Sequence, residues 1–283
     1  MAAKIEVHVD ENGTATLLLN RPEVHNAFDP EMVDQLATAL GKMRARSDVR
    51  AVVLMGAGAS FCAGADIAYM KSSARQAKAR NYAHAEQSAR MFHALYTLDK
   101  PTVACVRGAV RGGGCGLVAA CDIAVASRLA TFRFSEVKLG IVPAMISPYV
   151  IAAIGERMAR RYMLTGEEFD CAEAYRIGLV HDIVEEDDLV PRVSALLSQL
   201  YSSGPRAMAA VKQLVALGAH APIDERLVVE TSQRIADIRA TPEGQEGLAA
   251  FLEKRRPAWV EAVAKPARKP AKTARKRARK EAS

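Results

Sequence analysis

Three short apolar segments constrain the fold of this chain most strongly. Residues 51–55 read Ala-Val-Val-Leu-Met and run into Gly56-Ala57-Gly58, and residues 102–106 and 123–126 are similar runs. Such nearly uninterrupted apolar runs are typical of strands covered on both faces, as in a parallel sheet. Helical spacing over 66–98 and 113–121 separates them. The alternation predicts an α/β fold with right-handed crossovers.

The two ends of the chain differ from this central part. Residues 4–9 and 14–19 flank Glu11-Asn12-Gly13, which predicts a β-hairpin, and Asp29-Pro30 predicts the start of a helix over 30–46. The second half has a single strand signal, over 179–184. Its remaining segments predict helices, over 149–164, 171–177, 187–203, 205–218, 222–239 and 242–255. We predict a core over 1–200, a helical oligomerisation region over 201–258 and a basic disordered tail over 259–283.

The positive charge of the chain is concentrated in that tail. Residues 265–283 contain nine Lys or Arg and one Glu, whereas the whole chain has a net charge of +7, so the rest is close to neutral. A polybasic segment binds phosphates without sequence preference, and this one has no aromatic residue to stack on bases. We therefore expect at most non-specific nucleic-acid binding through 265–283, although a nucleic-acid-binding function stays an alternative of another class.

Cysteine usage and hydropathy indicate a reduced, cytoplasmic protein without a membrane span. The five cysteines lie among small apolar residues and form no CxxC pair, which argues against a disulfide framework or a metal site. No run of about 18 apolar residues occurs, and the N-terminus shows no secretory signal.

Two glycine-containing turns are candidates for part of a catalytic site. Residues 60–67 (Ser-Phe-Cys-Ala-Gly-Ala-Asp-Ile) and 108–117 (Gly-Ala-Val-Arg-Gly-Gly-Gly-Cys-Gly-Leu) each follow a predicted strand and open a helix. Backbone N–H groups at a helix start have no intrahelical partner and stabilise negative charge, so two such turns could form an oxyanion hole. Alone, each turn is equally compatible with ordinary helix packing. No Gly-Lys-Ser/Thr follows the glycines, and the pattern does not match a dinucleotide-binding fingerprint.

One carboxylate, Glu136, stands in an apolar context between Phe134-Ser135 and Val137. Apolar surroundings disfavour the charged form and raise the pKa of a carboxyl group toward the range useful for acid–base catalysis. A solvated glutamate at a helix start is the alternative interpretation.

In combination these segments resemble the enoyl-CoA hydratase/isomerase (crotonase) superfamily, from Leu17 to about residue 255. The resemblance is carried in order by 19–28, 61–67, 112–123, 135–140, 164–166 and 172–180. It implies a spiral of ββα units with a C-terminal helical trimerisation region, and a homotrimer or a dimer of trimers. It also implies an acyl-CoA substrate, and no cofactor, because CoA is part of that substrate.

Matched position by position, the resemblance assigns the oxyanion-hole N–H groups to Ala65 and Gly113 and the catalytic carboxylate to Glu136. It assigns substrate and CoA binding to nine positions: Glu23, His25, Ala27, Ala63, Ala65, Asp66, Ile67, Gly112 and Gly113. No metal ligand is implied.

One position departs from the pattern. Typical hydratases carry a second glutamate three residues after the oxyanion glycine, where this chain has Gly116. Residues 143–150 (Pro-Ala-Met-Ile-Ser-Pro-Tyr-Val) resemble methylglutaconyl-CoA hydratases of leucine or isoprenoid breakdown. We therefore expect a hydro-lyase acting on a branched or carboxylated 2-enoyl-CoA, with Gly116 leaving room for that acyl chain. An isomerase that moves a 3-enoyl double bond to the 2-position, using Glu136 alone, is the alternative.

Overall fold

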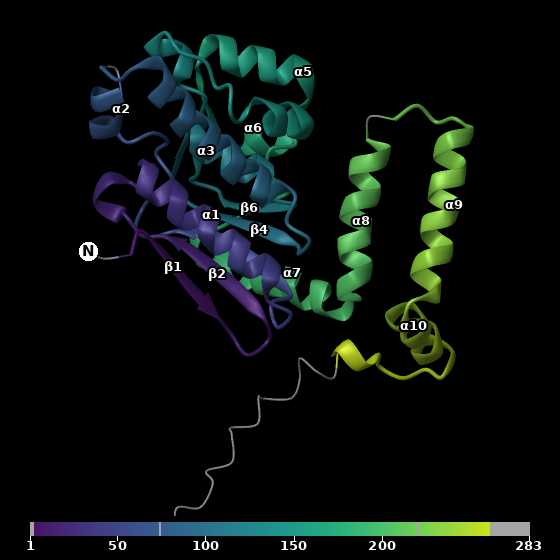
Figure 1. The fold of residues 1–283 in the computed structure, drawn as a ribbon. Helices are drawn as coiled ribbons and strands as arrows, with labels where there is room; N and C mark the ends of the chain where they lie inside the picture. The colour runs from purple at the N-terminus through teal and green to yellow at the C-terminus, as the bar shows by residue number, and fades with distance from the viewer. Residues whose placement is uncertain (1–2, 74, 220, 261–283) are drawn as a thin grey trace, which may run out of the picture.

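The computed structural model describes residues 3–73, 75–219 and 221–260, and its main element is a six-stranded sheet (Figure 1). The strand order is β1-β2-β3-β4-β6-β9. β1 (Ile5–Val9) and β2 (Thr14–Leu19) form the predicted antiparallel hairpin, and the other neighbours pair in parallel. The three strands predicted from apolar runs are β3 (Ala51–Gly56), β4 (Thr102–Val106) and β6 (Ile123–Ser127), and all three are almost completely buried. β9 (Asp182–Val184) lies at the edge.

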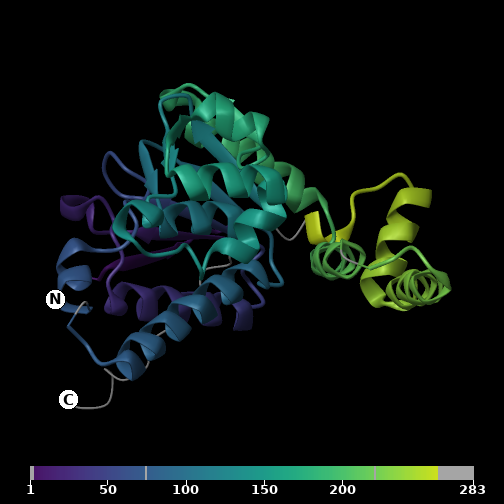
Figure 2. The ribbon, with the colours of Figure 1, turned by 90° about the horizontal axis from the view of Figure 1, so that it is seen from above.

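Helices cover both faces of this sheet, which explains the uninterrupted apolar runs. One face packs against α1 (Pro30–Ala45) and α3 (Lys78–Tyr96), whose inner residues belong to the main core (Figures 1 and 2). α7 (Leu189–Ser202) covers the other face, with Val193 and Leu197 packed against alternate residues of β3 and β4. The α1 start is as predicted, because the Asp29 carboxylate accepts from the Met32 N–H at 2.8 Å.

A second, three-stranded sheet was not predicted. It consists of β5 (Ala109–Arg111), β7 (Thr131–Arg133) and β8 (Glu168–Asp170), with β5 parallel and β8 antiparallel to β7. Three-residue strands are too short to show a hydrophobic period. The expectation of no strand after residue 150 other than the one near 179–184 was therefore wrong. The helices α4 (Gly113–Ala120), α5 (Ser147–Thr165) and α6 (Cys171–Arg176) follow these strands.

The helical stretch predicted over 66–98 is two helices rather than one. α2 (Ile67–Ser73) is a short helix with no buried residue, and α3 starts at Lys78. Three short 3-10 helices complete the core: η1 (Pro22–Val24), η2 (Glu136–Leu139) and η3 (Glu186–Asp188).

Three C-terminal helices stand to one side of this core (Figures 1 and 2). α8 (Pro205–Gly218) and α9 (Glu225–Ala240) have no buried residue, and α10 (Pro242–Leu252) has one, Ala250. An ion pair of 2.7 Å between Lys212 and Asp122 ties α8 to the core. No helix in the described part of the chain has both the length and the apolar composition of a bilayer-spanning segment. The basic segment 265–283 lies outside the described residues.

Candidate active site

The two glycine turns lie side by side, as an oxyanion hole requires. The Cys62 N–H donates to the Ala109 carbonyl at 3.3 Å, and the Arg111 N–H donates to the Cys62 carbonyl at 2.9 Å. Gly64 has a φ of +85°, and a Cβ there would lie 2.9 Å from the Arg111 carbonyl oxygen. Both the backbone conformation and the close approach of the two chains therefore require glycine at this position.

The two N–H groups assigned to the oxyanion hole make no hydrogen bond within the described residues. Phe28 pairs with the residues on either side of Ala65: its N–H donates to the Gly64 carbonyl and its carbonyl accepts from the Asp66 N–H. The Ala65 N–H is left out of this pairing, and the Gly113 N–H, at the first residue of α4, also has no acceptor in residues 3–73, 75–219 and 221–260. Both residues line one pocket, so two donors are available to the same bound oxygen.

Glu136 reaches the same pocket from the start of η2. Its Oε1 lies 2.8 Å from the position that a Cβ of Gly112 would occupy, so the carboxylate rests against the glycine turn. The other oxygen, Oε2, is buried and has no hydrogen-bond partner among the described residues. Burial without a compensating charge raises the pKa of the Glu136 carboxyl above its ordinary 4.5, in the direction expected from its apolar context.

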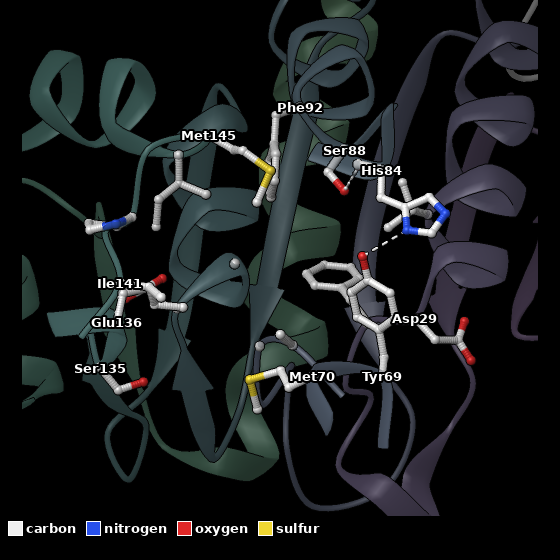
Figure 3. Close-up of a pocket in the computed structure, with 18 of the residues that line it drawn as sticks. Asp29, Tyr69, Met70, His84, Ser88, Phe92, Ser135, Glu136, Ile141 and Met145 are labelled. Carbon is white, nitrogen blue, oxygen red and sulfur yellow. Dashed lines mark hydrogen bonds between the residues drawn. The ribbon is translucent and has the colours of Figure 1, made fainter. Parts of the chain in front are cut away.

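The pocket that joins these groups is a cavity of about 200 Å³ between α2, α3 and the segment 135–146. Glu136 and Ser135 lie on one wall, and Tyr69, His84 and Asp29 lie on the opposite wall (Figure 3). Most of the remaining lining is apolar: Phe28, Val33, Met70, Met91, Phe92, Leu139, Ile141, Val142, Met145 and Ile146. An enclosed, mainly apolar pocket with a few polar groups is the usual form of a small-molecule site.

Gly116 does not leave room for an acyl chain, so that expectation was wrong. A Cβ at Gly116 would lie 2.7 Å from the Ile146 Cβ, closer still to the Ile146 Cγ2, and 3.1 Å from Phe92 Cε1. The Ile146 side chain is buried and lines the pocket, whereas Gly116 does not. The space that a side chain at position 116 would need is thus filled by an isoleucine.

The residues assigned to substrate and CoA binding divide into two groups. Ala63, Ala65, Gly112 and Gly113 line the pocket. The other five lie outside it, and their binding role stays a prediction: Glu23 and Ile67 are exposed, Ala27 is buried, the His25 Nδ1 lies 3.1 Å from the Ser60 Oγ, and Asp66 is buried.

Asp66 is fully occupied by structural contacts. Its carboxylate pairs with the Arg21 guanidinium at 2.9 Å and accepts from the N–H groups of Ala68 and Tyr69 at the start of α2. These contacts hold the turn of residues 63–67, and hence the Ala65 N–H, in place. They outweigh its burial and lower the pKa of the Asp66 carboxyl.

Sequence reasoning missed part of the pocket wall. His84, Ser88, Met91 and Phe92 all line the cavity from α3. Ser88 follows His84 by four residues, and Met91 and Phe92 follow Ser88 by three and four, which places them on one face of a helix; this was the available signal. Within the described ranges, no three His, Cys, Asp or Glu side chains are grouped as a metal site would require.

Comparison with known proteins identifies the family of this fold and pocket. The enoyl-CoA hydratase/isomerase family model matches residues 10–262. The chain belongs to this family. An enoyl-CoA hydratase structure from Shewanella pealeana superimposes with a TM-score of 0.88 at 41% identity, covering 91% of this chain and 96% of that one. The crotonase fold is therefore confirmed, and the chain is an enzyme of this family.

Relatives in the family differ in the acyl groups that their names specify. A candidate enoyl-CoA hydratase of Thermus thermophilus is 36% identical over 89% of this chain and 99% of its own. A short-chain-enoyl-CoA hydratase of Clostridium acetobutylicum is 33% identical, covering 87% of this chain and 94% of its own. An (E)-benzylidenesuccinyl-CoA hydratase of Thauera aromatica is also 33% identical, over 88% of this chain and 96% of its own. Sequence identity to these relatives therefore does not show which acyl group this enzyme takes.

Proposed function

We propose that this enzyme adds water across the double bond of a 2-enoyl-CoA thioester, or removes it in the reverse direction. The observation that carries this proposal is the convergence of three groups on one pocket: the half-buried Glu136, and the N–H groups of Ala65 and Gly113, which have no partner within the described residues. The names of the relatives support hydration over isomerisation.

The two N–H groups would bind the thioester oxygen and stabilise the negative charge that develops on it. As the water oxygen bonds to Cβ, the π electrons move toward Cα and the thioester becomes an enolate. Glu136 takes a proton from the water and then delivers a proton to Cα, which restores the carboxylate and closes the proton balance. Loss of one oxyanion donor costs about 2.7–4 kcal/mol of transition-state stabilisation in comparable enzymes.

For the substrate we propose a branched or carboxylated acyl chain such as 3-methylglutaconyl-CoA. The resemblance of residues 143–150 to methylglutaconyl-CoA hydratases supports this choice, and one relative is named for a succinyl-type acyl group. The pocket contributes a second argument, since Met145 and Ile146 of this segment form part of its wall. Leucine breakdown would be the corresponding process.

Mass-resolved turnover tests both parts of the proposal. 3-Methylglutaconyl-CoA, crotonyl-CoA and a 3-enoyl-CoA are offered to the wild type and to Glu136→Gln. We expect 3-methylglutaconyl-CoA to gain the mass of one water with the wild type and to stay unchanged with the variant. Hydration of crotonyl-CoA alone would refute the proposed acyl group but not the proposed hydration reaction.

The alternative activity, migration of a 3-enoyl double bond to the 2-position, has one structural observation in its favour. The position of a second glutamate is Gly116, and Ile146 fills the adjacent space, so Glu136 is the only carboxylate on its side of the pocket among the described residues. A single base suffices to carry a proton between Cα and Cγ. Conversion of the 3-enoyl-CoA without a change in mass would establish this activity instead.

For assembly we propose a homotrimer or a dimer of trimers built through the C-terminal helices. α8 and α9 bury none of their residues within the chain, yet they expose Val211, Val215, Val228, Val229 and Ile235. Apolar helix faces of this kind are typical of interfaces. Light scattering coupled to size-exclusion chromatography gives the molar mass directly, and a monomer would refute the proposal.

A further inference from the structure

A hydrogen-bonded pair of polar side chains, Tyr69 and His84, interrupts the apolar lining of the pocket. The Tyr69 hydroxyl lies 3.0 Å from the His84 Nδ1, and the two ring centroids are 5.7 Å apart. Tyr69 comes from α2 and His84 from α3, and both line the cavity. The pair lies on the wall opposite Glu136 (Figure 3).

In either tautomer of His84, the pair keeps one donor that is not used within it, and the Tyr69 hydroxyl lies on the cavity side of the His84 ring (Figure 3). If the Tyr69 hydroxyl donates to Nδ1, the Nε2 of His84 carries the other proton of the neutral ring. If Nδ1–H donates to the Tyr69 oxygen, the hydroxyl proton remains available. Neither group makes another side-chain hydrogen bond within the described residues. A ligand atom at this wall is therefore best matched by an acceptor oxygen.

A positive charge that acts on the pair favours an anionic acceptor. Burial raises the pKa of the Tyr69 hydroxyl, and the Arg80 guanidinium acts against this shift, so a positive charge lies close to the pair. The carboxylate on this wall is Asp29, and it is ion-paired: Lys4 lies 2.5 Å and Arg21 lies 3.4 Å from its Oδ2, and the same two cations also pair with Glu31 and Asp66. Asp29 thus shares its two cations with two further carboxylates, and Arg80 is the positive charge that acts on the Tyr69 hydroxyl itself.

We propose that Tyr69 and His84 bind a carboxylate carried by the acyl chain beyond Cβ, while Glu136 acts on Cα and Cβ from the opposite wall. This inference rests on the proposed hydration of an acyl-CoA and specifies which residues select its acyl group. It assigns to the pair a role in specificity and none in the proton transfers.

The test compares substrates that differ only in the carboxylate. 3-Methylglutaconyl-CoA and 3-methylcrotonyl-CoA are offered to the wild type, Tyr69→Phe, His84→Leu and the double variant. A hydrogen bond to a charged group corresponds to about 10- to 100-fold in affinity. We expect the double variant to lose this factor in kcat/KM, mainly through KM, for the carboxylated substrate alone. Each single variant keeps one donor and should lose less.

Tyr82→Phe is the matched control, because Tyr82 is also on α3 but is 68% exposed and does not line the pocket. It should leave both substrates unaffected. Equal losses on both substrates in the double variant, or no loss on either, would overturn the assignment of the carboxylate site.

Binding of two saturated analogues separates this inference from the proposed reaction. 3-Methylglutaryl-CoA and isovaleryl-CoA differ by the same carboxylate and have no double bond to hydrate. Calorimetry should show tighter binding of 3-methylglutaryl-CoA by the wild type, and loss of that preference in the double variant. This result would support the carboxylate site even if turnover refuted hydration, and a wild type without the preference would overturn it even if hydration were established.

Discussion

Replacement of Gly112 with alanine tests how the pocket holds its carboxylate. Gly112 has a φ of +46°, and its Cβ would lie 2.8 Å from Glu136 Oε1 and 3.4 Å from Glu136 Cδ. The left-handed backbone costs a residue with a Cβ about 1–2 kcal/mol. To regain an ordinary separation of 3.4 Å, the carboxylate oxygen must move by roughly 0.6 Å. Misplacement of a reacting group by 1 Å can cost about 100-fold in rate.

We therefore expect Gly112→Ala to lower kcat by about 10- to 100-fold. We also expect a fall in Tm of about 2–8 °C, at 2–4 °C per kcal/mol for a chain of this size class. The assay monitors steady-state hydration of the preferred enoyl-CoA through the loss of its conjugated absorbance. Melting curves are recorded at one protein concentration, because assembly shifts Tm.

Gly155→Ala is the control that separates backbone strain from displacement of the carboxylate. Gly155 has a φ of +73°, but no heavy atom lies within 4 Å of the position of its Cβ. It should lose a similar amount of stability and keep its kcat. If Gly112→Ala kept the wild-type kcat while both variants lost stability equally, the contact with Glu136 would have no catalytic importance and the reasoning would be refuted.

Three further predictions concern a carboxylate, a packed glycine and the tail. Because burial raises the pKa of Glu136, its ionisation destabilises the folded state above the raised pKa and no longer does so well below pH 4.5. Glu136→Gln should therefore raise Tm at pH 7 by an amount that shrinks toward pH 4, and a gain that grew on acidification would contradict this. Gly116→Ala should cost about 1–2 kcal/mol, from overpacking offset by helix propensity. In urea melts, Ile146→Ala should partly relieve this cost and Ile146→Val should not, since valine keeps the clashing Cγ2. Deletion of 265–283 should leave turnover intact and abolish salt-sensitive retention on a polyanion column; a collapse of turnover would show that the tail serves catalysis.

The long buried elements could be predicted from the sequence because local pattern and tertiary environment agree there. The runs at 51–55 and 102–106 became central strands, and the Asp29-Pro30 cap set the start of α1. The second sheet could not be predicted, since its strands have three residues each. Yet its pairing allows the Gly112 N–H to donate to the Arg133 carbonyl at 2.9 Å and brings Glu136 beside the glycine turn.

The place of His84 in the pocket wall could not be predicted for a different reason. A histidine on an amphipathic helix carries no local sign of what it faces, because the partner of His84 is Tyr69 on another helix. Likewise, a glycine in place of a larger residue predicts open space only if no other side chain fills that space. At Gly116 the neighbouring segment supplied Ile146, which no spacing rule connects to position 116. Such compensation between distant segments is visible only in three dimensions.

At Gly116, where the family pattern has a glutamate, the adjacent space is filled by Ile146. This has a consequence for the chemistry. With the apolar Ile146 side chain packed against Gly116, no second carboxylate among the described residues lies on that side of the pocket to receive the proton that hydration would remove from water. In the proposed hydration, Glu136 would then accept this proton and deliver one to Cα, so hydroxyl and hydrogen should add to the same face of the double bond. A group that acts as base and as acid in one turnover works best with a pKa near the operating pH. Burial of Glu136 without a charged partner shifts its pKa in that direction.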